Sequence, residues 1–116
     1  MEKENAIVNI TFEFALQVIV YCERLEGEKK FVISRQLLKS GTSIGANVRE
    51  AQSSESKTDF IHKLKIADKE AVETEYWLLL CKQSKNYPNP DTLLEKIISI
   101  KKLLSKIIST TKNSLK

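Results

Sequence analysis

Residues 39–52 read KSGTSIGANVREAQ, and this stretch predicts a helix that packs very close to a neighbour. Small and apolar residues recur here at helical spacing, in a stripe that comprises Leu37, Gly41, Ile44, Val48 and Ala51. Two glycines inside a helix cost roughly 1 kcal/mol each relative to alanine. We expect the compensating gain to be close approach of a second helix over Gly41 and Gly45, with Ala46 beside them. A bend at one glycine is the alternative interpretation.

The composition is that of a small soluble protein. A chain of 116 residues can bury a modest core, so we assign residues 1–116 to one domain. We expect no segment able to cross a bilayer and no signal peptide, and therefore a cytoplasmic protein that makes no membrane contact. Cys22 and Cys81 lie within apolar runs. We interpret them as reduced core thiols rather than as a disulfide or a redox pair.

The chain divides into helical segments at polar breaks near Gly27, Ser54 and Pro88. Periodic apolar residues between these breaks predict four helices, over about 6–25, 31–53, 57–85 and 90–112. We find no strand pattern in the sequence. Four helices with short connections predict an all-α, antiparallel up-down-up-down four-helix bundle.

The first predicted helix is more apolar than the core of a monomeric bundle requires. Its first stripe comprises Ile7, Ile10, Phe14, Val18, Tyr21 and Leu25. A second stripe beside it comprises Phe12, Ala15, Ile19 and Cys22. Because each helix of a four-helix monomer needs only one apolar stripe, the surplus predicts a second buried surface and hence a homo-oligomer.

The third and fourth predicted helices carry clear start signals. Ser56 and Asp59 are spaced as in a capping box, with Asp in place of the usual Glu. Asn89 is a cap candidate, and Pro90 suits the first helical position. A heptad-like seam along the third helix comprises Phe60, Leu64, Ala67, Ala71, Thr74, Leu78 and Cys81.

Polar side chains on the second and third helices are expected to meet. Glu70 and Glu73 share one face of the third helix. Asn47, Arg49 and Glu50 lie on the second helix. We expect a buried Arg–Glu network among them that holds the helices in register, rather than a catalytic pair of carboxylates.

The sequence offers no catalytic constellation. Asp59 and His62 have the carboxylate-x-x-His spacing of di-metal bundles, but His62 is the only histidine in the chain. We therefore interpret His62 as a surface residue. The sequence contains no phosphate loop, nucleophile elbow or Ser-His-Asp order. We predict that the protein is not an enzyme and has no metal or cofactor.

Three segments carry a family resemblance: SIGANVREA at 43–51, SKTDFI at 56–61 and IADKEAVETEYWL at 66–78. The chain resembles the four-helix-bundle proteins of the 23S rRNA intervening-sequence family over nearly its whole length. It is similar to the branch with Gly-Ala-Asn-Val, whereas many members have Pro at the position of Gly45. The family is also similar to accessory proteins of diversity-generating retroelements, which are basic pentamers that bind nucleic acid and reverse transcriptase.

The resemblance implies partners for the predicted oligomer. It implies a homopentameric ring, and it implies binding to RNA or DNA, or to a reverse transcriptase or another nucleic-acid enzyme. The resemblance supplies no enzymatic activity.

Charge is unevenly distributed along the chain. The net charge is +4, and residues 87–116, with six basic and two acidic side chains, carry an excess of +4. Residues 1–30, with four basic and six acidic side chains, have a net charge of −2. In a ring, the basic helix repeats around the axis and would attract a phosphate backbone without reading bases. The candidate phosphate-binding residues are Lys101, Lys102, Lys106, Lys112 and Lys116.

Two functions therefore remain open from the sequence. The first is a non-enzymatic oligomer that binds nucleic acid or a nucleic-acid enzyme. The second is a structural or protein-binding oligomer whose lysines only solvate the surface. Aromatic residues do not interleave with the lysines, so base stacking is not expected.

Overall fold

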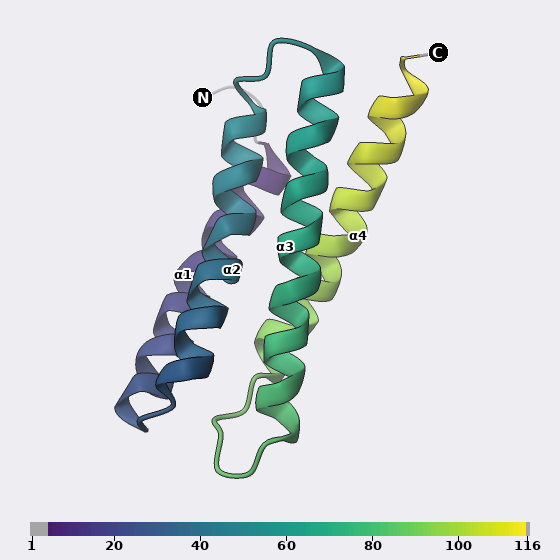
Figure 1. The fold of residues 1–116 in the computed structure, drawn as a ribbon. Helices are drawn as coiled ribbons and strands as arrows, with labels where there is room; N and C mark the ends of the chain where they lie inside the picture. The colour runs from purple at the N-terminus through teal and green to yellow at the C-terminus, as the bar shows by residue number, and fades with distance from the viewer. Residues whose placement is uncertain (1–4, 116) are drawn as a thin grey trace.

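The computed structural model describes residues 5–115, and these form four α-helices and no strand. The helices are α1 (Ala6–Gly27), α2 (Phe31–Ala51), α3 (Lys57–Gln83) and α4 (Asp91–Asn113). Each helix packs against the next along the chain, and α4 returns to contact α1 less extensively. Helix α1 begins at the end of the bundle where α4 finishes (Figure 1). The prediction of an all-α fold with four helices is confirmed.

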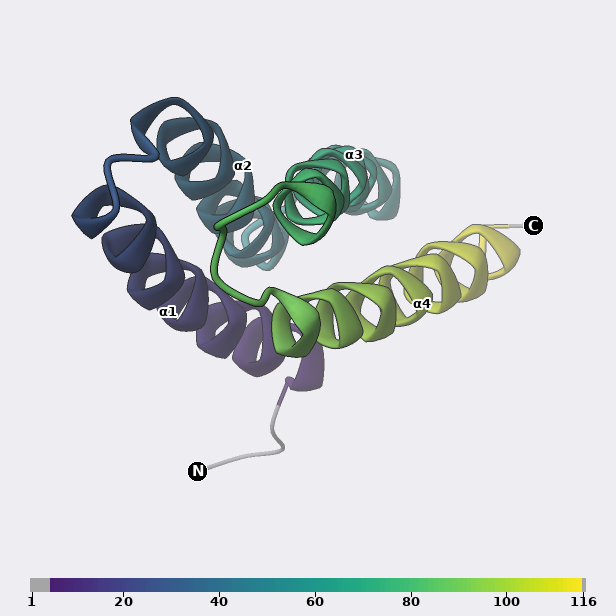
Figure 2. The ribbon, with the colours of Figure 1, turned by 90° about the horizontal axis from the view of Figure 1, so that it is seen from below.

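Helix α4 diverges from the other helices toward its C-terminal end (Figure 2). Its fully buried residues all lie in the first two thirds of the helix, and they are Leu93, Leu94, Ile97, Ile100 and Leu104. Ile107, which continues the same apolar stripe one turn later, is only partly buried. The last turns of α4 therefore have fewer partners and leave an open cleft beside α3.

The two glycines of α2 lie where α1 comes closest. A Cβ atom added at Gly41 would lie 2.9 Å from Val18 Cγ1, and one added at Gly45 would lie 3.2 Å from the carbonyl oxygen of Thr11. Both distances are shorter than ordinary van der Waals contacts, so the absence of a side chain at these two positions allows α1 to come this close. The prediction of close packing over Gly41 and Gly45 is confirmed. Ala46 is exposed and lies at the edge of the same seam.

The seam predicted for α3 forms the opposite side of the core. Phe60 is partly buried. The other six members are buried, and they are Leu64, Ala67, Ala71, Thr74, Leu78 and Cys81. The hydroxyls of Thr74 and Ser40 hydrogen-bond across the α2–α3 contact, 2.9 Å apart. Cys22 and Cys81 are free and buried, as predicted. Burial raises the pKa of the Cys22 thiol to about 11, so this thiol stays protonated at neutral pH.

The first connection differs in detail from the prediction. Helix α1 continues to Gly27, and the residue with left-handed backbone geometry is Lys29, at a φ of 63°. The break thus occurs two residues after the glycine that signalled it. Helices α2 and α3 each end two residues before the predicted position, at Ala51 and Gln83.

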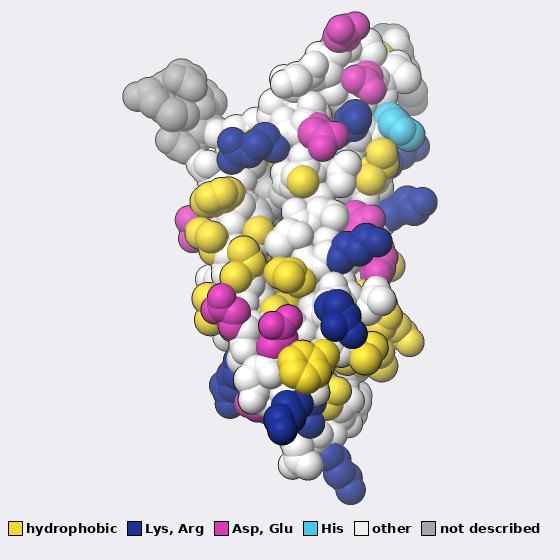
Figure 3. All heavy atoms as spheres, turned by 60° about the vertical axis from the view of Figure 1, so that its left-hand side comes forward, with side chains coloured by type: hydrophobic (Ala, Val, Ile, Leu, Met, Phe, Trp, Pro, Cys, Tyr) yellow, Lys and Arg dark blue, Asp and Glu magenta, His cyan; other side chains and the backbone are white. Residues whose placement is uncertain are grey.

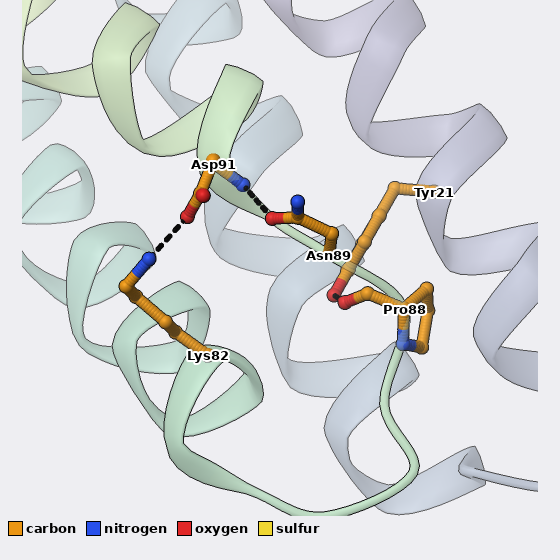
Figure 4. Close-up of polar contacts among 5 residues, drawn as sticks. All are labelled: Tyr21, Lys82, Pro88, Asn89 and Asp91. Carbon is orange, nitrogen blue, oxygen red and sulfur yellow. Dashed lines mark hydrogen bonds and ion pairs between the residues drawn. The ribbon is translucent and has the colours of Figure 1, made fainter.

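The α3–α4 connection is anchored to α1 (Figure 4). The Tyr21 hydroxyl donates a hydrogen bond to the carbonyl oxygen of Pro88, at 2.6 Å. Asn89 Oδ1 accepts from the backbone N–H of Asp91 at 2.8 Å, but the N-cap of α4 is Pro90 and the helix starts at Asp91. The predicted cap at Asn89 and first helical residue at Pro90 are therefore each one residue too early. Lys82 Nζ lies 2.5 Å from Asp91 Oδ1 and links the two helix ends.

Helix α3 begins with the predicted cap, because the Asp59 N–H donates to Ser56 Oγ at 3.0 Å. We expect Ser56→Ala to lower the free energy of unfolding by about 1 kcal/mol, since one helix-terminal N–H would lose its acceptor. Urea denaturation followed by circular dichroism measures this change. Ser53→Ala, on an exposed residue of the same connection, is the control and should leave stability unchanged. Equal stability of both variants would contradict the cap's contribution.

Helix α1 has the length and composition of a membrane-spanning helix, which the sequence analysis did not expect. Its mean hydropathy reaches 1.4 over 18 residues, of which 33% are buried inside the bundle. The core helix of a soluble protein and a signal sequence can have the same length and hydropathy, so the finding is weak evidence for a membrane span. The finding corrects our expectation that no segment is apolar enough to cross a bilayer. The high hydropathy of α1 reflects its exposed apolar residues, which are described below.

Candidate functional site

Two of the predicted lysines project from the free face of α4. Lys102 and Lys106 are exposed and lie four residues apart, so they share one face of the helix. That face is directed away from Ile100 and Leu104, which are buried in the core. Neither lysine forms an ion pair with a carboxylate of residues 5–115. Both ammonium groups are therefore free to bind an external anion.

Lys101 has a different environment from these two lysines. Its Nζ lies 2.6 Å from Glu75 Oε1 on α3, and both side chains are partly buried. The lysine thus joins α4 to α3, and its charge is already compensated. Lys101 is thus paired within the chain, unlike Lys102, because the 100° rotation between neighbouring helix positions turns it toward α3.

Lys112 lies next to a lysine that the sequence analysis did not select. Lys65 on α3 lines the same cleft. It lowers the pKa of Lys112, because it can donate a hydrogen bond only to the neutral amine of Lys112 and because its positive charge repels the charged form. The sequence offered no reason to select Lys65, because the basic and acidic side chains of the third helix nearly balance in number. Lys116 lies outside the described residues.

The predicted buried Arg–Glu network is wrong on the α2 side. Arg49 and Glu50 are exposed, because the glycine stripe takes the inward face of α2. The Arg49 guanidinium lies over the ring of Phe12, 5.7 Å from its centroid. Glu50 Oε1 lies 3.4 Å from Lys63 Nζ in an exposed ion pair.

On the α3 side, the predicted partners make local contacts instead. Glu73 accepts a hydrogen bond from Trp77 Nε1 at 3.1 Å, within its own helix. Asn47 donates to the carbonyl oxygen of Ser43 at 2.9 Å. Glu70 is partly buried and makes no ion pair within the described chain. Register between these helices is set by packing and by the hydroxyl contact of Thr74, which requires no buried charge.

Two apolar faces lie exposed on the bundle. The α1 face consists of Phe12, Leu16 and Ile19, and the α3 face consists of Val72, Tyr76 and Leu79. Hydrophobic side chains gather over α1 and α2 when this side of the molecule is viewed (Figure 3). A hollow of about 190 Å³ continues the α1 face into the glycine seam of α2. Helices α1 and α3 occupy opposite corners of the bundle, so the two faces are separate (Figure 2).

The described residues contain no group of three or more His, Cys, Asp or Glu side chains placed to hold a metal ion. His62 is exposed near the start of α3. The described residues thus present exposed lysines without carboxylate partners on α4 and exposed apolar faces on α1 and α3.

Comparison with known proteins places this fold in a family. The family model described as 23S rRNA-intervening sequence protein matches residues 3–106. A crystal structure from Bacteroides thetaiotaomicron, described as a protein with unknown function from the S23 ribosomal protein family, is 44% identical with a TM-score of 0.83. That similarity covers 88% of this chain and 97% of the Bacteroides chain. The search of curated proteins gave no significant match.

Proposed function

The chain belongs to the 23S rRNA-intervening sequence protein family, and we propose that it is a non-enzymatic homo-oligomer that binds the phosphate backbone of RNA or DNA. The observation that carries this proposal is the pair Lys102 and Lys106, exposed and without carboxylate partners on the outward face of α4. Lysine ammonium groups recognise phosphate by charge and carry no base information. Binding is therefore independent of nucleotide sequence.

The oligomer we propose is a ring, with subunits whose helices run up-down-up-down. A ring joins two different surfaces of each subunit, whereas a twofold dimer joins one surface to itself. The α1 face and the α3 face supply two such surfaces at opposite corners of the bundle. The resemblance to accessory proteins of diversity-generating retroelements supports five subunits. In such a ring the α4 lysines recur around the axis and their potentials add.

A double reversal of charge tests the nucleic-acid proposal. We expect Lys102→Glu with Lys106→Glu to weaken binding to all duplexes alike, with the fold retained. Each lysine that neutralises a phosphate contributes about 0.9 to the slope of log affinity against log salt for duplex DNA, so the slope should fall by about 1.8. Fluorescence anisotropy with a labelled duplex at several salt concentrations measures both quantities.

The matched control reverses two charges on α2. Arg35→Glu with Lys39→Glu makes the same change on exposed residues four positions apart, far from α4. This control should keep most of the affinity and the original salt slope. If the α4 variant binds like the parent, the lysines only solvate the helix.

That outcome would favour a second candidate function, a structural or protein-binding oligomer. The exposed α1 and α3 faces support it, because contiguous apolar surface is typical of protein contacts. A reverse transcriptase or another nucleic-acid enzyme is the partner class implied by the family resemblance. If such an enzyme co-purifies with a variant of this protein that does not bind RNA or DNA, the result would support this second function.

A further inference from the structure

The divergence of α4 from α3 opens a cleft near the C-terminal end of α4. The cleft has a volume of about 400 Å³. Its polar lining comes from both helices and comprises Lys65, Asp68, Ser105, Ser109, Lys112 and Asn113. The two helices separate here in both ribbon views (Figures 1 and 2). The cleft is thus a space between elements, with donors on two walls.

Two like charges meet in this cleft without a partner. Lys65 and Lys112 are exposed, and neither makes an ion pair with a carboxylate of the described chain. Their proximity lowers the pKa of Lys112, because the neutral amine of Lys112 could accept a hydrogen bond from Lys65 and because the two charged forms repel each other. Asp68 is the only carboxylate among the described lining residues, so the formal charge of the cleft is +1. An anion bound between the two ammonium groups would relieve their repulsion.

We propose that this cleft binds one phosphate group of a polynucleotide backbone, held between Lys65 and Lys112. The hydroxyls of Ser105 and Ser109 and the amide of Asn113 offer neutral hydrogen-bond donors for the remaining phosphate oxygens. A backbone phosphodiester carries one negative charge, which matches the formal charge of the cleft. This inference rests on the proposed function, because it names the residues that would fix the strand on the bundle.

The cleft continues onto the free face of α4. With 100° of rotation per residue, Ser105 and Ser109 lie between Lys112 and Lys102 around the helix. A strand with one phosphate in the cleft could therefore place later phosphates near Lys102 and Lys106. The cleft and the outward lysines would form one track, with α3 contributing Lys65.

Neutral variants test the cleft separately from the outward lysines. We expect Lys65→Gln with Lys112→Gln to lower the salt slope by about 0.9, because the two lysines share one phosphate. At 0.15 M salt this corresponds to roughly fivefold weaker binding. Asp68→Asn should act in the opposite direction and tighten binding. The control Arg35→Gln with Lys39→Gln removes the same charge from α2 and should keep the parental slope.

The outcomes separate this inference from the proposed function. If the parent binds no duplex in low salt, the proposed function falls and this inference falls with it. If the parent binds and the cleft variant keeps its affinity and slope, only the cleft assignment is overturned. If inorganic phosphate at constant ionic strength binds to the parent and not to the cleft variant but displaces no duplex from the parent, the cleft is a free-phosphate site and the assignment is overturned as well. Thermal unfolding monitors folding, and the cleft variant should melt no lower than the parent because it removes a repulsion.

Discussion

Replacing Gly41 by leucine is expected to lower the free energy of unfolding by about 3 kcal/mol, the upper end of the usual range for overpacking a core. The first added atom alone would lie 2.9 Å from Val18 Cγ1. Val18 is fully buried, and a β-branched side chain in a helix has one preferred rotamer, so it cannot turn aside. The two helices must then separate. The gain of less than 1 kcal/mol in helix propensity does not offset this loss.

The other glycines provide graded controls for this prediction. A Cβ at Gly27 would meet no atom within 4 Å, so Gly27→Ala should be neutral or stabilising by up to about 1 kcal/mol. The stability of Gly45→Ala should lie between those of Gly41→Leu and Gly27→Ala. Its Cβ would approach the backbone oxygen of Thr11, which has no rotamer to change. Urea denaturation of the three variants gives the order. Stability of Gly41→Leu equal to that of the parent would show that the seam is not tight.

Placing two glutamates on the α1 face is expected to convert the oligomer into monomers of 13.2 kDa. Phe12 and Leu16 are 51% and 44% exposed in the single chain, so Phe12→Glu with Leu16→Glu should leave the fold intact. In the proposed ring these positions are buried against the next subunit. Two unpaired carboxylates there would have to be desolvated, which prevents association. Light scattering at micromolar concentration measures the mass.

The control for the oligomer uses an apolar pair outside the α1 face. Phe31→Glu with Val32→Glu adds the same charge at the start of α2, where both residues are exposed. This variant should keep the parental mass. A parental mass near that of one chain would contradict the oligomer itself. An unchanged mass for the α1 variant would place the subunit contact elsewhere.

Much of the fold could be predicted from the sequence, because helical periodicity is a local property of the chain. The apolar repeat located all four helices, and their ends differ from the prediction by at most two residues. The spacing of Gly41 and Gly45 likewise predicted a close contact, since only a packing gain offsets two helix glycines. The i,i+4 spacing of Lys102 and Lys106 placed both on one face, which the structure shows to be free.

The tertiary structure decided which residues meet between helices. Rotation of α2 about its axis turned Arg49 and Glu50 outward and removed the predicted buried network. The alignment of α3 with α4 placed Lys101 in an ion pair with Glu75 and brought Lys65 beside Lys112. None of these pairings follows from spacing along one helix. The physical reason is that periodicity determines which side of a helix is apolar, whereas axial shift and rotation between helices depend on the packing of all the side chains at the contact.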